Sequence, residues 1–214
     1  MRSRESIIAA GNGRTGGALA IGLLGPLDVS VGERPVALTA GRLRAVLAVL
    51  ALSAGQAVSV ERLAVSVWGD EKPPGNVRRS VQTYIARLRG ALGAESIGSA
   101  PTGYVLRADH RHVDALRFSK LLSTANAAAG TGAERAFLGE ALDLWRGMPF
   151  EGVPSAWLEA SKAPGMVEQY LTALERRIDL DIAAGRHGEI IGELSDLTAR
   201  YPLREPLWAR LLTV

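Results

Sequence analysis

Cysteine is absent from the 214-residue sequence, which excludes disulfide bonds and metal sites built on thiolates. Aromatic residues make up only 5% of the chain, whereas 47% of it is hydrophobic, which is ample for folded cores. No apolar run reaches about 18 residues, the length that would span a membrane. The first apolar patch, which follows two arginines, is broken by GNGRTGG before it attains the length of a signal-peptide core. These absences predict a soluble, cytoplasmic protein with no membrane partner.

The balance of charge differs between the two halves of the chain. Residues 1–110 hold 13 Lys and Arg against 8 Asp and Glu, a balance of +5. Residues 111–214 hold 12 against 14, a balance of −2. A basic half joined to a slightly acidic half predicts two domains, the first of which faces a polyanion. An arginine-rich composition alone is the alternative explanation.

The segment NVRRSVQTYIARLRGALG, residues 76–93, predicts a helix with one apolar and one basic face. Asn76 is its expected N-cap and Gly93 its expected end. At about 100° per residue, seven residues form one apolar stripe: Val77, Val81, Tyr84, Ile85, Leu88, Ala91 and Leu92. No acidic residue occurs between Lys72 and Ala94, so the opposite face lacks the mixed-sign pairs of an ordinary solvated helix. We therefore predict that this face binds a polyanion, and solvent-facing arginines are the alternative.

The surrounding segments predict the architecture of residues 19–109. Three short apolar runs, at 21–24, 27–31 and 35–38, are separated by turn residues and predict a small antiparallel sheet. Helices are expected over 40–53, capped by Thr39, and over 60–68, capped by Ser59 and closed by Gly69. Two further strands are expected near 96–98 and 104–107. This order predicts a winged helix-turn-helix, in which the third helix enters the major groove and the hairpin lies along the DNA backbone. Residues 1–18 are expected to form a flexible tail.

The second half, residues 110–214, predicts an all-α domain. Helices are expected over 114–129, 133–145, 155–184 with a break at Pro164-Gly165, 187–201, and from 205 onward, with no strand between 113 and 214. Placing Pro202 at the end of a tetratricopeptide unit puts Gly185 in the turn between its helices, and Pro149 and Gly132 repeat that offset. The domain is therefore expected to be tetratricopeptide-like. Its last helix has an apolar face without a following partner, so we expect the native chain to continue beyond Val214; a natural short form that caps itself is the alternative.

Signals for catalysis or metal binding are weak. Gly11, Gly13 and Gly16 spell G-x-G-x-x-G. A dinucleotide site needs a strand before this motif and a long helix after it, and the sequence predicts neither. Four potential metal ligands lie close together at the interdomain junction: Asp109, His110, His112 and Asp114. A polar contact between the domains is favoured there over a metal site. Asp179 and Asp181 are two apart on a predicted helix, so they point in different directions. We therefore predict no catalytic residue, no metal, no cofactor and no enzymatic activity.

Nine motifs occur in one order over residues 19–212: LGPLDV, RLRAVLAVLAL, VSVERLAVSVWGD, PPGNVRRSVQTYIARLRGALG, TGYVL, VDALRFSKLL, ALDLWRGMPFEG, LERRIDLDIAAGRHGEII and YPLREPLW. Their order resembles the SARP family, the actinomycete antibiotic-regulatory transcriptional activators. The resemblance implies an OmpR-type winged helix followed by a bacterial transcriptional activation domain. It also implies binding to direct repeats in double-stranded promoter DNA, with a second copy of the chain. A further implied partner is RNA polymerase, including its sigma factor, with biosynthetic genes as the target.

The predicted DNA contacts combine this resemblance with side-chain chemistry. Arginine can bind guanine O6 and N7 in pairs, glutamine can do the same at adenine, and a small residue permits close approach or touches a thymine methyl. The expected base-contacting residues are Arg78, Arg79, Gln82, Thr83 and Ala86. The expected DNA-backbone contacts are Arg42, Arg44, Asn76, Ser80, Arg87, Arg89, Thr102, Gly103 and Tyr104. Arg79 stands where the family commonly has asparagine, so the family's base preference at this position does not carry over to this sequence. The alternative function is a helical interaction or sensing module with an auxiliary basic domain.

Overall fold

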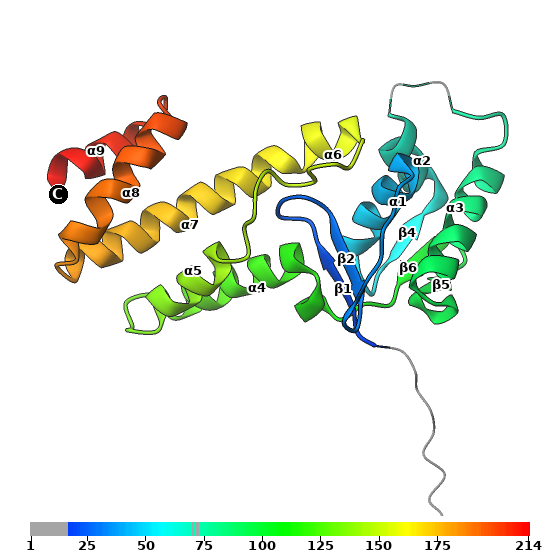
Figure 1. Ribbon diagram of the computed structural model, residues 1–214, viewed down its shortest axis with the longest axis horizontal. Helices are drawn as coiled ribbons and strands as arrows, with labels where there is room; N and C mark the ends of the chain where they lie inside the picture. The colour runs from blue at the N-terminus through cyan, green and yellow to red at the C-terminus, as the bar shows by residue number, and fades with distance from the viewer. Residues whose placement is uncertain (1–16, 70, 72) are drawn as a thin grey trace, which may run out of the picture.

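The computed structural model describes residues 17–69, 71 and 73–214. Figure 1 shows a mixed part that contains the sheets and an elongated helical part that extends away from it, with the C-terminus at the far end from α3. The glycine motif at Gly11, Gly13 and Gly16 lies outside the described residues. None of the helices in the described ranges is both long and apolar enough to cross a membrane.

The N-terminal sheet is antiparallel, as predicted. It contains β1 (Leu19–Gly22), β2 (Asp28–Val31) and β3 (Arg34–Pro35) in the order β1-β2-β3. The register pairs Leu19 with Val31 and Ile21 with Val29, and the side chains of Leu19, Ile21 and Val29 are buried. Because side chains alternate along a strand, this register directs one face of the sheet toward the core. The third strand has two residues, fewer than the predicted 35–38.

The three helices of the first domain are α1 (Gly41–Ala51), α2 (Val60–Trp68) and α3 (Val77–Leu92). Two predicted N-caps are confirmed, since Ser59 Oγ accepts the Arg62 N–H at 3.1 Å and Asn76 Oδ1 accepts the Arg79 N–H at 2.9 Å. The predicted Thr39 cap is wrong. Ala40 occupies the cap position of α1 in extended conformation, so Thr39 lies one residue too early and no side chain caps this helix.

A second sheet completes the winged helix-turn-helix. It contains β4 (Ala57–Ser59), β5 (Ile97–Ser99) and β6 (Gly103–Leu106) in the antiparallel order β4-β6-β5. The hairpin β5–β6 is the predicted wing. Strand β4 was not predicted, and it pairs with β6 through Val58 and Tyr104. The wing is therefore anchored to the segment that leads directly into α2.

Helix α1 is buried on all sides along most of its length. The predicted apolar face of Leu43, Val46, Leu47 and Leu50 is buried, but so is every other residue from Ala45 to Ala51. A helix that is apolar all round belongs at the centre of a core. The helical part covers the second side of α1. Its residues Phe118, Phe150 and Leu158 belong to the same hydrophobic cluster as the side chains of α1.

The helical part has six α-helices in the described residues: α4 (Asp114–Ala127), α5 (Glu134–Leu142), α6 (Ala156–Ser161), α7 (Ala163–Ala183), α8 (His187–Arg200) and α9 (Glu205–Thr213). The short 3-10 turn η1 (Ala94–Ser96) connects α3 to the wing, and η2 (His110–His112) connects the wing to the helical part. The predicted break at Pro164-Gly165 is misplaced: the break lies at Lys162, between α6 and α7, and Pro164 lies in the first turn of α7, where its missing N–H costs nothing. Residues 113–214 are fully described and contain no strand, although Val113 and Glu151 form isolated bridges to the N-terminal part.

Hydrogen bonds join the two parts at buried positions. The carboxylate of Asp114 accepts the backbone N–H groups of Leu23 at 2.7 Å and Leu24 at 2.9 Å. Ser155 Oγ donates to the Ser66 carbonyl at 2.6 Å and caps α6 as well. Asp114 therefore acts in a polar interdomain contact, and in the described part of the chain no three metal-ligating side chains come together. The boundary at residues 109 and 110 stays a prediction.

Candidate nucleic-acid interface

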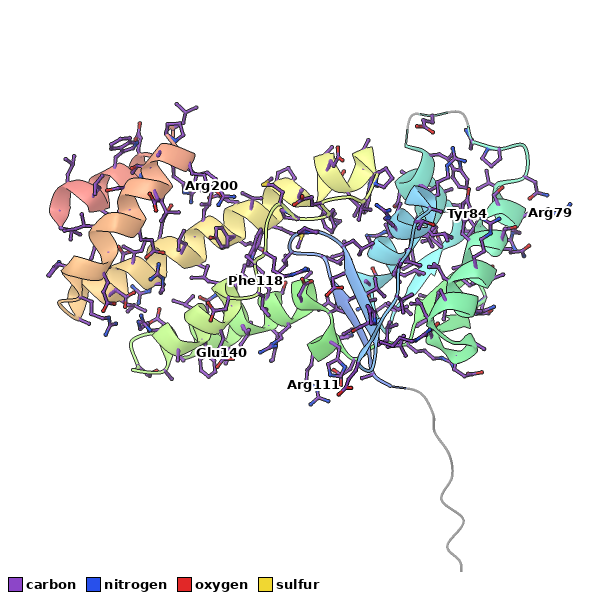
Figure 2. The ribbon with its side chains drawn as sticks, in the orientation of Figure 1. Arg79, Tyr84, Arg111, Phe118, Glu140 and Arg200 are labelled. Atoms are coloured by element: carbon purple, nitrogen blue, oxygen red, sulfur yellow. The ribbon has the colours of Figure 1, made fainter. Side chains whose placement is uncertain are left out.

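The two faces of α3 are separated as the sequence predicts. Val81, Ile85, Leu88 and Leu92 are buried, and Tyr84 is half-buried against Trp68, with ring centroids 6.1 Å apart. Figure 2 shows Tyr84 on the side of α3 that faces α2 and Arg79 on the outer side. All five predicted base-contacting residues are exposed: Arg78, Arg79, Gln82, Thr83 and Ala86. The helix therefore presents one continuous polar face to solvent.

The basic side chains on this face have few internal partners. Among the described residues, Arg78, Arg79 and Arg87 form no salt bridge. One carboxylate lies nearby: the pKa of Glu61 is lowered, mainly by hydrogen bonds from its own backbone and from Ser59, and least by the charge of Arg78. Glu61 belongs to α2, outside the acid-free segment 72–94, so its proximity to Arg78 arises only in the fold. Acceptors on DNA can bind these three guanidinium groups without displacing an internal salt bridge of the described chain.

Three polar side chains near the start of α3 already make local hydrogen bonds. Asn76 caps the helix, Ser80 Oγ donates to the Asn76 carbonyl at 3.2 Å, and Thr83 Oγ1 donates to the Arg79 carbonyl at 3.0 Å. A hydroxyl that donates its proton still has lone pairs to accept with. Thr83 can therefore accept from a base amino group in this rotamer, whereas a donation to phosphate requires rotation of its side chain.

The wing has a tip of two residues. Ala100 and Gly103 exchange backbone hydrogen bonds of 2.8 and 3.2 Å, which leaves Pro101 and Thr102 exposed at the turn. Thr102 is placed as the prediction requires. Gly103 is not, since it is buried and its N–H donates to Ala100, so it has no donor to offer a phosphate. Tyr104 is half-buried against the core.

Arg89 and Arg44 make hydrogen bonds inside the molecule, which leaves fewer of their donors for the predicted contacts with the DNA backbone. Arg89 donates from Nε to the Ile97 carbonyl at 2.8 Å and from Nη2 to Ser99 Oγ at 3.1 Å, which ties α3 to the wing. Arg44 donates to the Leu38 carbonyl at 2.6 Å and to the Gly152 carbonyl at 2.8 Å, which ties α1 to the helical part. None of the three carbonyl partners leaves a signal in the sequence.

Arg42 is intermediate between these cases. It lies 3.6 Å from Glu71 and 5.9 Å from the centre of the Trp68 ring. Both charged side chains are more than half exposed, and exposed pairs of this kind contribute little and exchange readily. Arg42 can therefore leave Glu71 for a phosphate. Arg42, Arg87 and Thr102 are therefore among the predicted backbone contacts that the structure leaves available.

A helix-turn-helix with a wing, whose third helix exposes arginines that form no salt bridge with a described residue, defines a winged-helix transcriptional regulator. The comparisons with known families agree. Residues 33–106 match the family described as "Transcriptional regulatory protein, C terminal", and residues 113–214 match the "Bacterial transcriptional activator domain". The chain belongs to the SARP family of transcriptional regulators, and the predicted fold, an OmpR-type winged helix followed by a helical domain, is confirmed.

Relatives in actinomycetes are similar along most of this chain. The transcriptional regulatory protein EmbR of Mycobacterium tuberculosis is 34% identical over 213 residues, which cover 95% of this chain and 55% of EmbR. The regulatory protein DnrI of Streptomyces peucetius is 34% identical over 206 residues, which cover 90% of this chain and 75% of DnrI. The chain thus spans about half of EmbR. These relatives are regulators and not enzymes, which agrees with the absence of a predicted active site.

A solved structure shares the arrangement of both parts. It is Mycobacterium tuberculosis EmbR in complex with a low-affinity phosphopeptide, with a TM-score of 0.83 and 33% sequence identity. The match covers 91% of this chain and 54% of that one. The phosphopeptide is a ligand of EmbR in that complex. What this chain shares with it is the fold.

Proposed function

We propose that the protein activates transcription by binding promoter DNA through the exposed face of α3 and the tip of the wing. The observation that carries the proposal is that Arg78, Arg79 and Gln82 lie together on an exposed face where no described carboxylate pairs with the arginines. Arginine and glutamine supply the paired donors and acceptors that distinguish guanine and adenine in the major groove. Arg42, Arg87 and Thr102 supply contacts to phosphate on either side.

The helical domain acts once the winged helix is bound to DNA. It recruits RNA polymerase and contacts its sigma factor, and the genes switched on are those of secondary-metabolite biosynthesis. Support comes from the family match of residues 113–214 and from the resemblance to antibiotic-regulatory activators. Two copies bind side by side on direct repeats, which requires a head-to-tail contact between two different surfaces of the chain. The mixed part and the elongated helical part provide such surfaces.

Truncation of the groove-facing side chains is expected to remove specificity. Arg79→Ala or Gln82→Ala should each cost about 1 to 3 kcal/mol on the cognate site and little on random duplex, because base contacts carry the sequence information. Fluorescence anisotropy with both duplexes at one fixed salt concentration measures the difference.

The matched control is Arg87→Ala on the flank of the same helix. It should weaken binding to both duplexes alike and lower the slope of log K against log salt by about one, because it removes one phosphate contact. Equal losses on cognate and random DNA for Arg79→Ala and Gln82→Ala would show that these two side chains touch only phosphate. Failure of the unaltered chain to prefer a promoter over random duplex would favour an interaction module instead.

Cooperative binding is expected to depend on the spacing of the repeats. Winged-helix copies on one face of B-DNA are separated by about one turn, roughly 10 to 10.5 base pairs. Inserting about five base pairs between the repeats should abolish cooperativity, because it rotates one copy to the opposite face. Inserting a full turn should partly preserve it. Quantitative footprinting at both repeats measures the effect, and indifference to both insertions, or a two-fold dimer in the absence of DNA, would rule out the tandem arrangement.

A further inference from the structure

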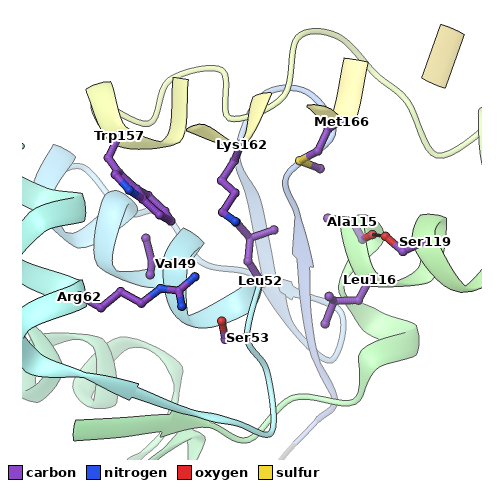
Figure 3. Close-up of a pocket in the computed structure, with 10 residues that line it drawn as sticks. All are labelled: Val49, Leu52, Ser53, Arg62, Ala115, Leu116, Ser119, Trp157, Lys162 and Met166. Carbon is purple, nitrogen blue, oxygen red and sulfur yellow. Dashed lines mark hydrogen bonds between the residues drawn. The ribbon is translucent and has the colours of Figure 1, made fainter. Parts of the chain in front are cut away.

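A cavity of about 210 Å³ lies between the winged-helix part and the helical part. Figure 3 shows side chains of both parts around it: Ser53 and Arg62 from one, and Trp157, Lys162 and Met166 from the other. Helices α1 and α2 lie between α6 and the recognition helix α3 in Figure 1, so this cavity is separate from the DNA-binding face.

Two cations converge at one wall of the cavity. The Arg62 guanidinium carbon lies 5.7 Å from the centre of the Trp157 ring, and Lys162 Nζ lies 5.5 Å from it. Both side chains extend into the space between the walls in Figure 3. Neither forms a salt bridge with any described residue. Attraction to the ring explains why each cation lies near Trp157, and no described carboxylate balances the two like charges.

The remaining walls define the other properties of a ligand. Leu52, Leu116 and Met166 are among the apolar side chains that line the cavity. Ser119 Oγ donates to the Ala115 carbonyl at 3.1 Å, so it faces a ligand only as an acceptor. Ser53 Oγ makes no hydrogen bond to another described residue, so it can donate to a ligand. A mostly apolar cavity with a few convergent polar groups is the usual form of a small-molecule site.

We infer that this cavity binds a small organic anion, with its carboxylate between Arg62 and Lys162 and a planar apolar body against Leu52, Leu116 and Met166. An anion between the two cations removes their repulsion and gains charge-assisted hydrogen bonds. The volume is about that of seven liquid water molecules at roughly 30 Å³ each, which suits an aromatic acid of one or two rings. Ser53 completes the head-group contacts as a donor.

The test uses the complete chain and 2-naphthoate as the probe. The indole N–H resonance of Trp157, assigned by its loss in Trp157→Phe, should move saturably in ¹⁵N-correlated NMR spectra as 2-naphthoate is added. The uncharged analogue 2-naphthalenemethanol should bind at least about tenfold more weakly, because it cannot use the two cations. Both affinities are measured on the unaltered chain, and Trp157→Phe serves only to assign the resonance.

Substitutions then locate the head group. Arg62→Gln and Lys162→Gln should each weaken 2-naphthoate at least about fivefold, corresponding to one lost charge-assisted contact. Lys120→Gln is the matched control, since Lys120 is an exposed lysine on α4 that does not line the cavity, and it should leave the affinity unchanged.

Four results would overturn the inference. They are no saturable shift up to about 10 mM probe, a concentration well above an ordinary weak Kd; equal binding of acid and alcohol; inorganic phosphate binding as tightly as 2-naphthoate; and an equal loss in Lys120→Gln. DNA binding is measured separately, so a failure here leaves the proposed function untouched, and the converse is also true.

Discussion

Replacing Asp181 with asparagine is expected to lower the free energy of unfolding by about 3 kcal/mol, toward the lower end of the range for breaking a buried charge pair. The Asp181 side chain is only 3% exposed and accepts hydrogen bonds from Arg135 Nε at 2.5 Å, Arg177 Nη1 at 3.1 Å and Arg186 Nε at 2.9 Å. These arginines come from α5, α7 and the turn before α8. Asparagine removes the charge that holds them together and directs an amide N–H toward guanidinium groups. The arginines are partly exposed, so water offsets some of the loss.

The same carboxylate should make the stability depend on acid pH. Burial raises the pKa of Asp181, but hydrogen bonds from Arg135 and Arg186 outweigh it, and the pKa lies below its ordinary value. A pKa that is lower in the folded than in the unfolded chain contributes stability that is present above the unfolded value, about 3.9, and is lost as pH falls through the folded value. The difference in stability between the unaltered chain and Asp181→Asn should therefore narrow below about pH 4.

Urea unfolding followed by circular dichroism at pH 7 and at pH 3.5 measures both effects. Asp196→Asn is the matched control, because Asp196 is exposed on α8 and pairs with no described residue. It should change stability by no more than about 0.5 kcal/mol. Equal losses in the two variants would show that the Asp181 cluster contributes nothing to stability, and a gap that stays constant between the two pH values would show that folding does not lower the pKa of Asp181.

The helices could be predicted from sequence because their signals are local. The apolar stripe of α3 and the caps Ser59 and Asn76 act within one turn, so the residues that determine each helix lie inside it or beside it. The same holds for α4 and α8, whose observed ends differ from the predicted ones by no more than two residues. Thr39 failed as a cap because two plausible starts lie one residue apart, and the packing of α1 decides between them.

Strand β4 could not be predicted, because it exists only through a partner far along the chain. Ala57, Val58 and Ser59 are too few for a periodic pattern, and their pairing with Val105, Tyr104 and Gly103 forms only when the wing folds back. The complete burial of α1 has the same origin. Its second face is covered by side chains from the helical part, which no window around residues 41–51 contains.

The same distinction between local signals and distant contacts applies to the candidate site. Periodicity placed Arg79, Gln82 and Ala86 on an exposed face, and the structure agrees. The sequence shows that Arg44 and Arg89 are basic, but it does not show that their guanidinium groups donate to backbone carbonyls. Sequence shows which side chains carry charge, whereas the fold decides which charges remain available to DNA. Arg89 thereby acts also as a brace between α3 and the wing.

The brace depends on the sheet beneath it, and Gly103→Ala is expected to disrupt that sheet. A Cβ on Gly103 would lie 1.9 Å from the Val58 carbonyl oxygen and 2.8 Å from the Ser59 Cα. Both neighbours are backbone atoms, so no side chain can rotate away and β4 and β6 must separate. The expected cost is about 3 kcal/mol, at the upper end for overpacking because ladder hydrogen bonds are lost as well. For a chain of this size, that corresponds to a melting temperature lower by roughly 6 to 12 °C.

Gly98→Ala in the facing strand β5 is the matched control. Its Cβ would meet the guanidinium of Arg107 at 3.2 Å, and this flexible, exposed side chain can move aside, so the change should cost less than about 1 kcal/mol. Thermal unfolding of both variants gives the comparison, and amide exchange at Tyr104 reports on the pairing of β4 with β6. Faster exchange at Tyr104 in Gly103→Ala alone is expected, since Tyr104 pairs with Val58 across the strand boundary that must open, and the alternation of hydrogen bonds along β6 directs its N–H toward β4. If Gly103→Ala has the same melting temperature as Gly98→Ala and protects Tyr104 equally well, β4 does not anchor the wing, and the hydrogen bonds from Arg89 to Ile97 and Ser99 remain as a link between the wing and α3.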